Sequence, residues 1–304
     1  MNPLFKFVLK LASSPKIDMQ EDYELVRKIQ DLFSRTSSDD YIFLDEKIYS
    51  EDEKHEIPVR IFYPKNRVYE EYIIYIHGGG WTLGNIESYT SACVNLANEL
   101  GRIVFSIDYR KAPENPFPAG FNDVYQAVRT LLTPVSDKKQ RKWIIMGDSA
   151  GANLAAAVSL KLRDQGLRIP KKQVLLYPAT YWDHSIESPF ESMHTFGYDY
   201  GLTIKKITEY MVMYAPDEES RKQPYISPLM ADNLENQPDT LVITAEFDPL
   251  RDEGEAYGKA LLKAGNRVEI RRILDSVHGF ITYPPYVTPL RTAYETMNTF
   301  LNKD

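Results

Sequence analysis

Cysteine is almost absent from the sequence. The 304 residues include a single one, Cys93, so no disulfide can form within the chain. This is compatible with a reducing compartment, and we expect a cytoplasmic protein in which Cys93 is a small packing residue of a helix. The sequence also has no Cys/His cluster at metal-binding spacing and no H-E-x-x-H motif. These absences predict that the protein needs no metal and no cofactor.

Long apolar runs are absent as well. No stretch is long and apolar enough to span a membrane, so we expect no stable membrane insertion. Near the N-terminus, Lys6 and Lys10 interrupt the apolar residues between positions 4 and 11. A signal peptide would have an uninterrupted apolar centre. The spacing instead favours an amphipathic helix over the site, with a peripheral membrane contact as the lesser alternative.

Positive charge is in deficit. The 36 Lys and Arg residues are outnumbered by 43 Asp and Glu residues, which gives a net charge of −7. This balance argues against nucleic acid as a partner. The hydrophobic content of 43% is normal for a soluble globular protein, and we expect residues 1–304 to form a single domain with a sizeable core.

Strand patterns alternate with helical patterns along most of the chain. The expected strands are residues 41–49, 59–63, 72–76, 103–107, 143–146, 174–177, 241–244 and 268–273. The expected helices between the later strands are residues 87–100, 121–132, 153–165, 253–263 and 289–300. This alternation predicts an α/β fold with a mostly parallel eight-stranded sheet and helices on both faces. The first strands lack intervening helices, so they should pair antiparallel at one edge.

One long stretch, residues 180–224, breaks the alternation and is rich in aromatic side chains. Long insertions at the carboxyl edge of a sheet usually carry function. We expect it to form a helical cap over the site together with residues 1–38. The alternative is plain packing of a second helical layer, and both can hold at once.

A serine lies at the tip of a glycine-flanked turn. Residues 147–151 read Gly-Asp-Ser-Ala-Gly and directly follow the apolar strand pattern of residues 143–146. Glycines before and after Ser149 let a strand and a helix pack closely around a strained turn, which lifts the serine hydroxyl clear of the backbone. Ser149 is therefore the candidate nucleophile. Taken alone, the pentapeptide could equally be an ordinary glycine turn.

Three successive glycines, Gly78 to Gly80, follow the strand pattern of residues 72–76 and His77. Backbone N–H groups in such a loop are free to turn towards a developing oxyanion. We expect the donors to be the N–H groups of Gly78, Gly79 and Ala150, the residue after the serine. A phosphate-binding loop does not fit, since neither G-x-x-x-x-G-K-[ST] nor G-x-G-x-x-G occurs here.

An acid and a base follow two later strand patterns. Asp248 comes just after the apolar residues 240–245, whereas Asp252 and Glu253 fit the first turn of the next helix. Of the five histidines, only His278 lies in a loop between a late strand and the closing helix. The order Ser149, Asp248, His278 is that of an α/β-hydrolase triad.

These segments together resemble the hormone-sensitive-lipase-like esterases of the α/β-hydrolase superfamily. The matching stretches are residues 77–81, 108–114, 116–119, 147–151, 248–253 and 278–280. The resemblance implies a serine hydrolase of short-chain esters, with acyl groups from acetyl to butyryl, that works through an acyl-enzyme. It also implies that Asp108 and Arg110 hold the glycine loop. Lys111 and Ala152 depart from the family pattern at positions without a catalytic role.

Other functions remain open at this point. An amidase such as an arylformamidase uses the same parts, because ester and amide share a tetrahedral intermediate. A small-molecule receptor on this fold is less favoured, since such receptors lack the histidine that His278 supplies. A lipase acting at an interface is the third alternative. We expect the partners to be an ester and water, with a possible homodimer through the edge strand at residues 268–273.

Overall fold

The computed structural model describes residues 16–33, 41–133 and 141–303, together with Lys6, Leu9, Lys10 and Ser13. Most of the apolar residues expected to form an amphipathic N-terminal helix, Leu4, Phe5, Phe7, Val8 and Leu11, lie outside the described residues. Within the first 38 positions, the described helix is α2 (Met19–Phe33). No helix in the described part of the chain is long and apolar enough to cross a membrane.

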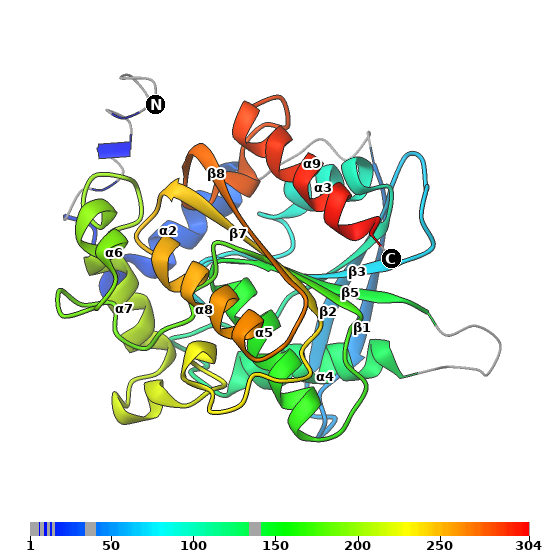
Figure 1. Ribbon diagram of the computed structural model, residues 1–304, viewed down its shortest axis with the longest axis horizontal. Helices are drawn as coiled ribbons and strands as arrows, with labels where there is room; N and C mark the ends of the chain where they lie inside the picture. The colour runs from blue at the N-terminus through cyan, green and yellow to red at the C-terminus, as the bar shows by residue number, and fades with distance from the viewer. Residues whose placement is uncertain are drawn as a thin grey trace.

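One eight-stranded sheet forms the centre of the molecule (Figure 1), with the order β1-β2-β4-β3-β5-β6-β7-β8. The strands are β1 (Ile42–Tyr49), β2 (Glu56–Tyr63), β3 (Tyr72–Ile76), β4 (Ile103–Ile107), β5 (Trp143–Asp148), β6 (Lys172–Leu176), β7 (Asp239–Phe247) and β8 (Val268–Val277). All eight coincide with expected strands. The predicted fold class, an α/β-hydrolase fold with a mostly parallel sheet, is confirmed.

The antiparallel part of the sheet lies at one edge, as expected. β1 pairs antiparallel with β2, and β2 pairs antiparallel with β4. Only residues 50–55 join β1 to β2, which is enough for a hairpin but too short for a crossover helix. From β4 to β8 every pair is parallel, so these strands all end at the same edge.

Helices cover both faces of the sheet and enclose two cores (Figure 1). One face carries α3 (Thr90–Leu100) and α9 (Thr288–Leu301). The other carries α4 (Ala119–Leu132), α5 (Ala150–Asp164) and α8 (Arg251–Lys263). α5 is alanine-rich and buried along most of its length, which lets it pack closely on the sheet and on the neighbouring helix α4.

A group of helices lies beside the sheet rather than on its faces (Figure 1). It contains α2, α6 (Glu191–Phe196) and α7 (Ile204–Tyr214). α2 is attached to α7 where the Met19 N–H donates to the Glu209 carboxylate at 2.9 Å. Segments from the two ends of the expected cap, far apart in sequence, are therefore in direct contact.

Candidate active site

Four loops meet at the carboxyl edge of the sheet. The glycine loop follows β3, Ser149 follows β5, Asp248 follows β7 and His278 follows β8. Since these strands are parallel, residues that follow them are brought to one rim of the sheet. The fold therefore gathers side chains that are up to 129 positions apart in sequence.

Ser149 occupies a strained turn between β5 and α5. Its backbone angles are φ 53° and ψ −122°, in a region that residues with a Cβ rarely adopt. A Cβ at Gly147 would lie 2.4 Å from the Gly151 carbonyl oxygen, and one at Gly151 would lie 2.0 Å from the Ile76 oxygen. Glycine is therefore required on both sides of the serine.

The structure brings Ser149, Asp248 and His278 into one hydrogen-bonded chain. His278 Nδ1 is 2.8 Å from Asp248 Oδ2, and His278 Nε2 is 2.8 Å from Ser149 Oγ. Asp248 is fully buried, and its other oxygen accepts the Leu250 N–H at 2.9 Å. The carboxylate is thus fixed on one side and holds the imidazole on the other, which leaves Nε2 facing the serine hydroxyl.

The structure of the glycine loop corrects one of the predicted oxyanion donors. The Gly78 N–H donates to Asp148 Oδ1 at 2.8 Å, so it is not available to an oxyanion, and the expected role of Gly78 is wrong. Gly78 continues the line of β3, whose neighbour β5 ends at Asp148, and its N–H therefore points to that side chain. Gly79 and Ala150 line the cavity beside Ser149, as does Gly80, which the sequence interpretation left out.

Asp148 is a second residue that sequence reasoning missed. Its buried carboxylate accepts hydrogen bonds from the Tyr75 hydroxyl at 2.8 Å and the Tyr89 hydroxyl at 3.0 Å, besides the Gly78 N–H. Burial raises the pKa of the Asp148 carboxyl, and these hydrogen bonds act against the rise. Asp148 ties the glycine loop to the serine turn. The sequence signal that could have identified Asp148 is its position directly before the candidate nucleophile.

His77 directly precedes the glycine loop and anchors its start in the core. It is fully buried, stacks on Tyr109 with ring centroids 4.5 Å apart, and its Nε2 lies 3.6 Å from Asp108 Oδ1. Burial acts to raise the pKa of Asp108, but His77 and Lys111 outweigh it and lower that pKa to about 2. Asp108 thus lies close to His77 at the start of the glycine loop.

Arg110 does not share that role. Its guanidinium donates to both carboxylate oxygens of Asp123, at 2.9 and 2.8 Å, on the first turns of α4. Its own backbone N–H donates to the same carboxylate. Arg110 therefore fastens the chain after β4 to α4, and the expectation that it holds the glycine loop is wrong.

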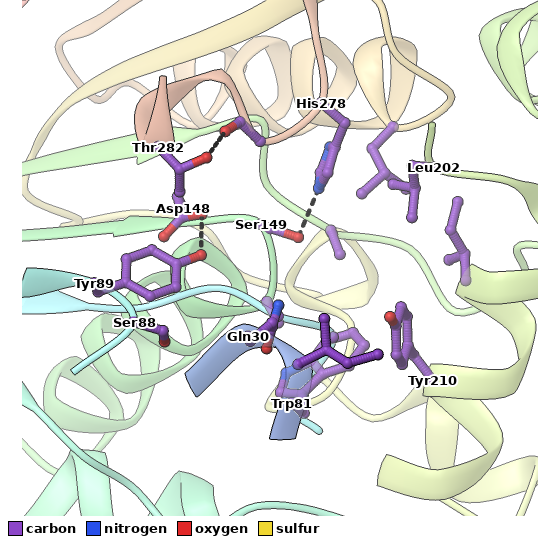
Figure 2. Close-up of a pocket in the computed structure, with 18 of the residues that line it drawn as sticks. Gln30, Trp81, Ser88, Tyr89, Asp148, Ser149, Leu202, Tyr210, His278 and Thr282 are labelled. Atoms are coloured by element: carbon purple, nitrogen blue, oxygen red, sulfur yellow. Dashed lines mark hydrogen bonds between the residues drawn. The ribbon is translucent and has the colours of Figure 1, made fainter. Parts of the chain in front are cut away.

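A cavity of about 570 Å³ opens onto Ser149 and His278 (Figure 2). Its walls include Ile29 and Gln30 of α2, and Ile207 and Tyr210 of α7. Trp81, which follows the glycine loop, also contributes to the lining. The described residues contain no group of three or more His, Cys, Asp or Glu side chains that could hold a metal ion.

Comparison with known proteins agrees with this geometry. A family model described as an α/β-hydrolase fold matches residues 73–282. An arylesterase of Saccharolobus solfataricus is 36% identical over 266 residues, which cover 86% of this chain and 85% of that protein. An ethyl acetate hydrolase of Pseudomonas putida is 32% identical over 75% of this chain and 72% of its own length.

The solved structures give the same result. A hyperthermophilic esterase from Pyrobaculum calidifontis has a TM-score of 0.86 and 32% sequence identity, with 98% of this chain and 97% of that chain covered. Both the sheet and the surrounding helices are thus shared over nearly the whole length. The chain belongs to the hormone-sensitive-lipase-like esterases of the α/β-hydrolase fold.

Proposed function

We propose that the protein is a serine carboxylic ester hydrolase of short-chain acyl esters, with Ser149 as nucleophile, His278 as general base and Asp248 as the residue that orients the imidazole. The observation that carries the proposal is the continuous hydrogen-bonded chain from Asp248 through His278 to Ser149. A serine hydroxyl is a weak nucleophile until such a base accepts its proton.

The reaction follows from these contacts in two halves. Ser149 Oγ attacks the ester carbonyl carbon while its proton passes to His278 Nε2, and Asp248 stabilises the imidazolium. The tetrahedral intermediate collapses, the alcohol leaves with the proton from Nε2, and an acyl-enzyme remains. Water then loses a proton to His278 and attacks the acyl carbon, and His278 passes that proton to Ser149 Oγ as the acid is released.

The negative charge of the tetrahedral intermediate needs donors. We assign them to the N–H groups of Gly79, Gly80 and Ala150, which line the cavity, in place of Gly78. Ala150 is the first residue of α5, so its N–H has no partner within the helix and lies at the positive end of the helix dipole. Each such donor stabilises the transition state by about 3 kcal/mol.

We also propose that residues 1–38 and 180–224 form a cap on a single domain. Ile29 of α2 and Ile207 and Tyr210 of α7 line the same cavity as Ser149, which supports this role. The cap then limits the length of the acyl chain, since its side chains form part of the wall of a cavity of about 570 Å³. A cytoplasmic location is consistent with the single, buried Cys93.

The test is hydrolysis of p-nitrophenyl esters from acetyl to palmitoyl by the wild type and by Ser149→Ala. We expect a maximum at short chains and a loss of kcat of about a million-fold in the variant, because the nucleophile is gone. Ser159→Ala, at a buried serine within α5, is the matched control and should retain activity. Substantial hydrolysis by Ser149→Ala would contradict the proposal.

The amide alternative is tested with matched substrates. An ester and an amide of the same acyl group pass through the same intermediate, but the amide nitrogen is the poorer leaving group. We expect the ester to be hydrolysed faster by this enzyme. A higher kcat/KM for the amide would identify an amidase, whereas a receptor would hydrolyse neither.

A further inference from the structure

A second cavity lies at the edge of the sheet opposite to Ser149. β3, β5 and β6 are parallel, so their first residues share one edge, whereas Ser149 follows the other end of β5. Residues at the start of these strands line the second cavity together with the end of α9, which comes to the same edge (Figure 1). Its volume is about 160 Å³, against about 570 Å³ for the cavity at Ser149. The second cavity is therefore separate from the proposed catalytic centre and suits a small ligand.

Positive charge dominates the walls of this second cavity, which we call the basic cavity. Its cationic side chains are those of Arg102, Lys142, Lys171, Lys172 and Lys303. Among the described residues that line it, Glu71 is the one carboxylate. Lys303 is paired with Glu269 at 2.6 Å, but Lys142 and Lys171 form no ion pair with a described side chain. The chain as a whole has a net charge of −7, so this excess of cations is local, and it favours an anionic ligand.

Lys172 contributes a buried charge to the basic cavity, since the residue is 6% exposed. Its Nζ donates to three backbone oxygens at the end of α9, those of Phe300, Leu301 and Lys303. The last turn of a helix leaves such carbonyl groups without partners of its own. An ammonium group has three protons, so Lys172 acts on a ligand through its charge. Burial lowers the pKa of Lys172, and the nearby Lys171 lowers it further, which a bound anion would counteract.

Arg102 contributes a second buried charge and has one donor left over. The residue is 1% exposed, and its Nη1 donates to the Leu100 oxygen and its Nη2 to Asn302 Oδ1, each at 2.8 Å. Its Nε has no hydrogen-bond acceptor among the described residues. The Glu71 carboxylate lies 3.5 Å from Nε, which is an ion-pair distance but too long for a good hydrogen bond. A buried cationic donor without an acceptor is costly, and an oxygen-rich anion in the cavity would reduce that cost.

We propose that the basic cavity binds a phosphate dianion, either as free inorganic phosphate or as the phosphoryl group of a small metabolite. Lysine ammonium groups bind phosphate as point charges, and guanidinium groups match its oxygens. Several cations around one small space suit a dianion better than a carboxylate monoanion. The bound group lies between the starts of β5 and β6 and the end of α9, so it stabilises the folded chain without contacting Ser149.

The experiment is isothermal titration of the full chain, without an ester substrate, at pH 8, where phosphate groups are dianions. Inorganic phosphate, glycerol 3-phosphate and acetate are added in turn at one ionic strength. We expect one site per chain for a phosphate, and an affinity for acetate that is lower by about tenfold or more, because acetate carries a single charge. Tighter binding of inorganic phosphate supports the free ion as ligand, and tighter binding of glycerol 3-phosphate supports a phosphate ester. Absence of binding, or equal affinity for acetate, would overturn the proposal.

Two lysines of the cavity wall, Lys142 and Lys171, are exposed, so their replacement should leave the fold intact. In Lys142→Gln/Lys171→Gln the affinity for phosphate should fall by about tenfold or more, because two charged contacts are lost. Lys259→Gln/Lys263→Gln, at two exposed lysines of α8, is the matched control with the same change in net charge, and it should bind phosphate as the wild type does. Equal losses in both double variants would show a response to net charge alone and would overturn the proposal.

Glu71→Gln should change the affinity in the opposite direction. It removes the carboxylate of the cavity wall, so phosphate should bind about threefold more tightly, and weaker binding would contradict the proposal. Phosphate should also raise the melting temperature of the wild type but not that of Lys142→Gln/Lys171→Gln. Phosphate should leave the KM for a short-chain p-nitrophenyl ester unchanged, because the two cavities lie at opposite edges of the sheet. Competitive inhibition would place the anion beside Ser149 and would overturn the proposal.

Discussion

Two carboxylates near the end of β7 have different surroundings. Asp248 is fully buried and is bonded to His278 Nδ1, whereas Asp252 lies on the first turn of α8 and is bonded to Arg251 and the Ser192 N–H. Only the first can set the tautomer of the histidine that faces Ser149.

We therefore expect Asp248→Asn to lower kcat by about 10⁴-fold, because the amide no longer stabilises the imidazolium. Asp252→Asn should reduce kcat by less than about tenfold and serves as the matched control. Both are measured with a short-chain p-nitrophenyl ester, with circular dichroism to check the fold. A severe loss in Asp252→Asn alone would mean that the acid is wrongly assigned.

Sequence reasoning located the three groups of the proposed triad because each follows a recognisable apolar strand. It assigned the wrong role to the Gly78 N–H for a physical reason. The direction of a backbone N–H depends on which strand lies alongside. Gly78 faces Asp148 only because β3 and β5 are neighbours, and these strands are separated by α3, β4 and α4 in the chain. Asp148 was missed for the same reason.

At the scale of elements, an ion pair lies within the loop after β4, next to the glycine loop that follows β3. Asp108 lies near His77 and accepts a hydrogen bond from Lys111 Nζ at 2.7 Å, and its pKa falls from 3.8 to about 2. A carboxylate whose pKa is lower in the folded state stabilises the fold above its unfolded pKa. That contribution is lost as the pH falls from about 4 to about 2.

We expect Asp108→Asn to lower the free energy of unfolding by ~2 kcal/mol at neutral pH, with the difference from wild type disappearing near pH 2. Urea unfolding at pH 7, 4 and 2 measures this. Glu219→Gln removes a surface pair with Lys222 and should have little effect at any of these pH values. A difference that does not change with pH would argue against the ion pair as its cause.

The eight expected strands and the five helices expected with bounds appear in the structure in the same order, but not with the same ends. β7 and β8 both extend beyond the apolar residues that predicted them, and α5 begins at Ala150 rather than Asn153. Pairing along the sheet continues the strands through polar residues. α5 starts early because the serine turn leads directly into it, although Gly151 is a poor helix former. The helices α6 and α7 were expected only as a cap, without bounds.

At the scale of the whole molecule, the edge strands of the sheet are the places where two copies of the chain could pair. β8 is the last strand in the order, and its Leu274 side chain is 68% exposed. Unpaired backbone groups and exposed apolar side chains on an edge strand favour pairing with a second copy. The homodimer considered from the sequence stays a prediction.

We expect light scattering to give a molar mass of about twice that of one chain, and Leu274→Asp to halve it by placing a charge on the edge. Leu44→Asp is the matched variant on β1, the opposite edge, where Leu44 is 45% exposed. It should leave the dimer intact. If Leu44→Asp alone dissociated the dimer, the contact would lie at β1 rather than at β8. A monomeric wild type would rule out the dimer.

The origin of the cavity walls has a consequence for how such an enzyme diversifies. The groups assigned to bond making follow strands of the sheet, where Gly147 and Gly151 leave no space for any larger residue. Part of the cavity wall belongs instead to α2 and α7, which pack beside the sheet. Exchanges at Ile29 or Ile207 would thus redirect substrate choice at little risk to the reaction itself, whereas the Tyr210 ring packs against Gly80 of the glycine loop. Libraries for new specificities belong on those helices.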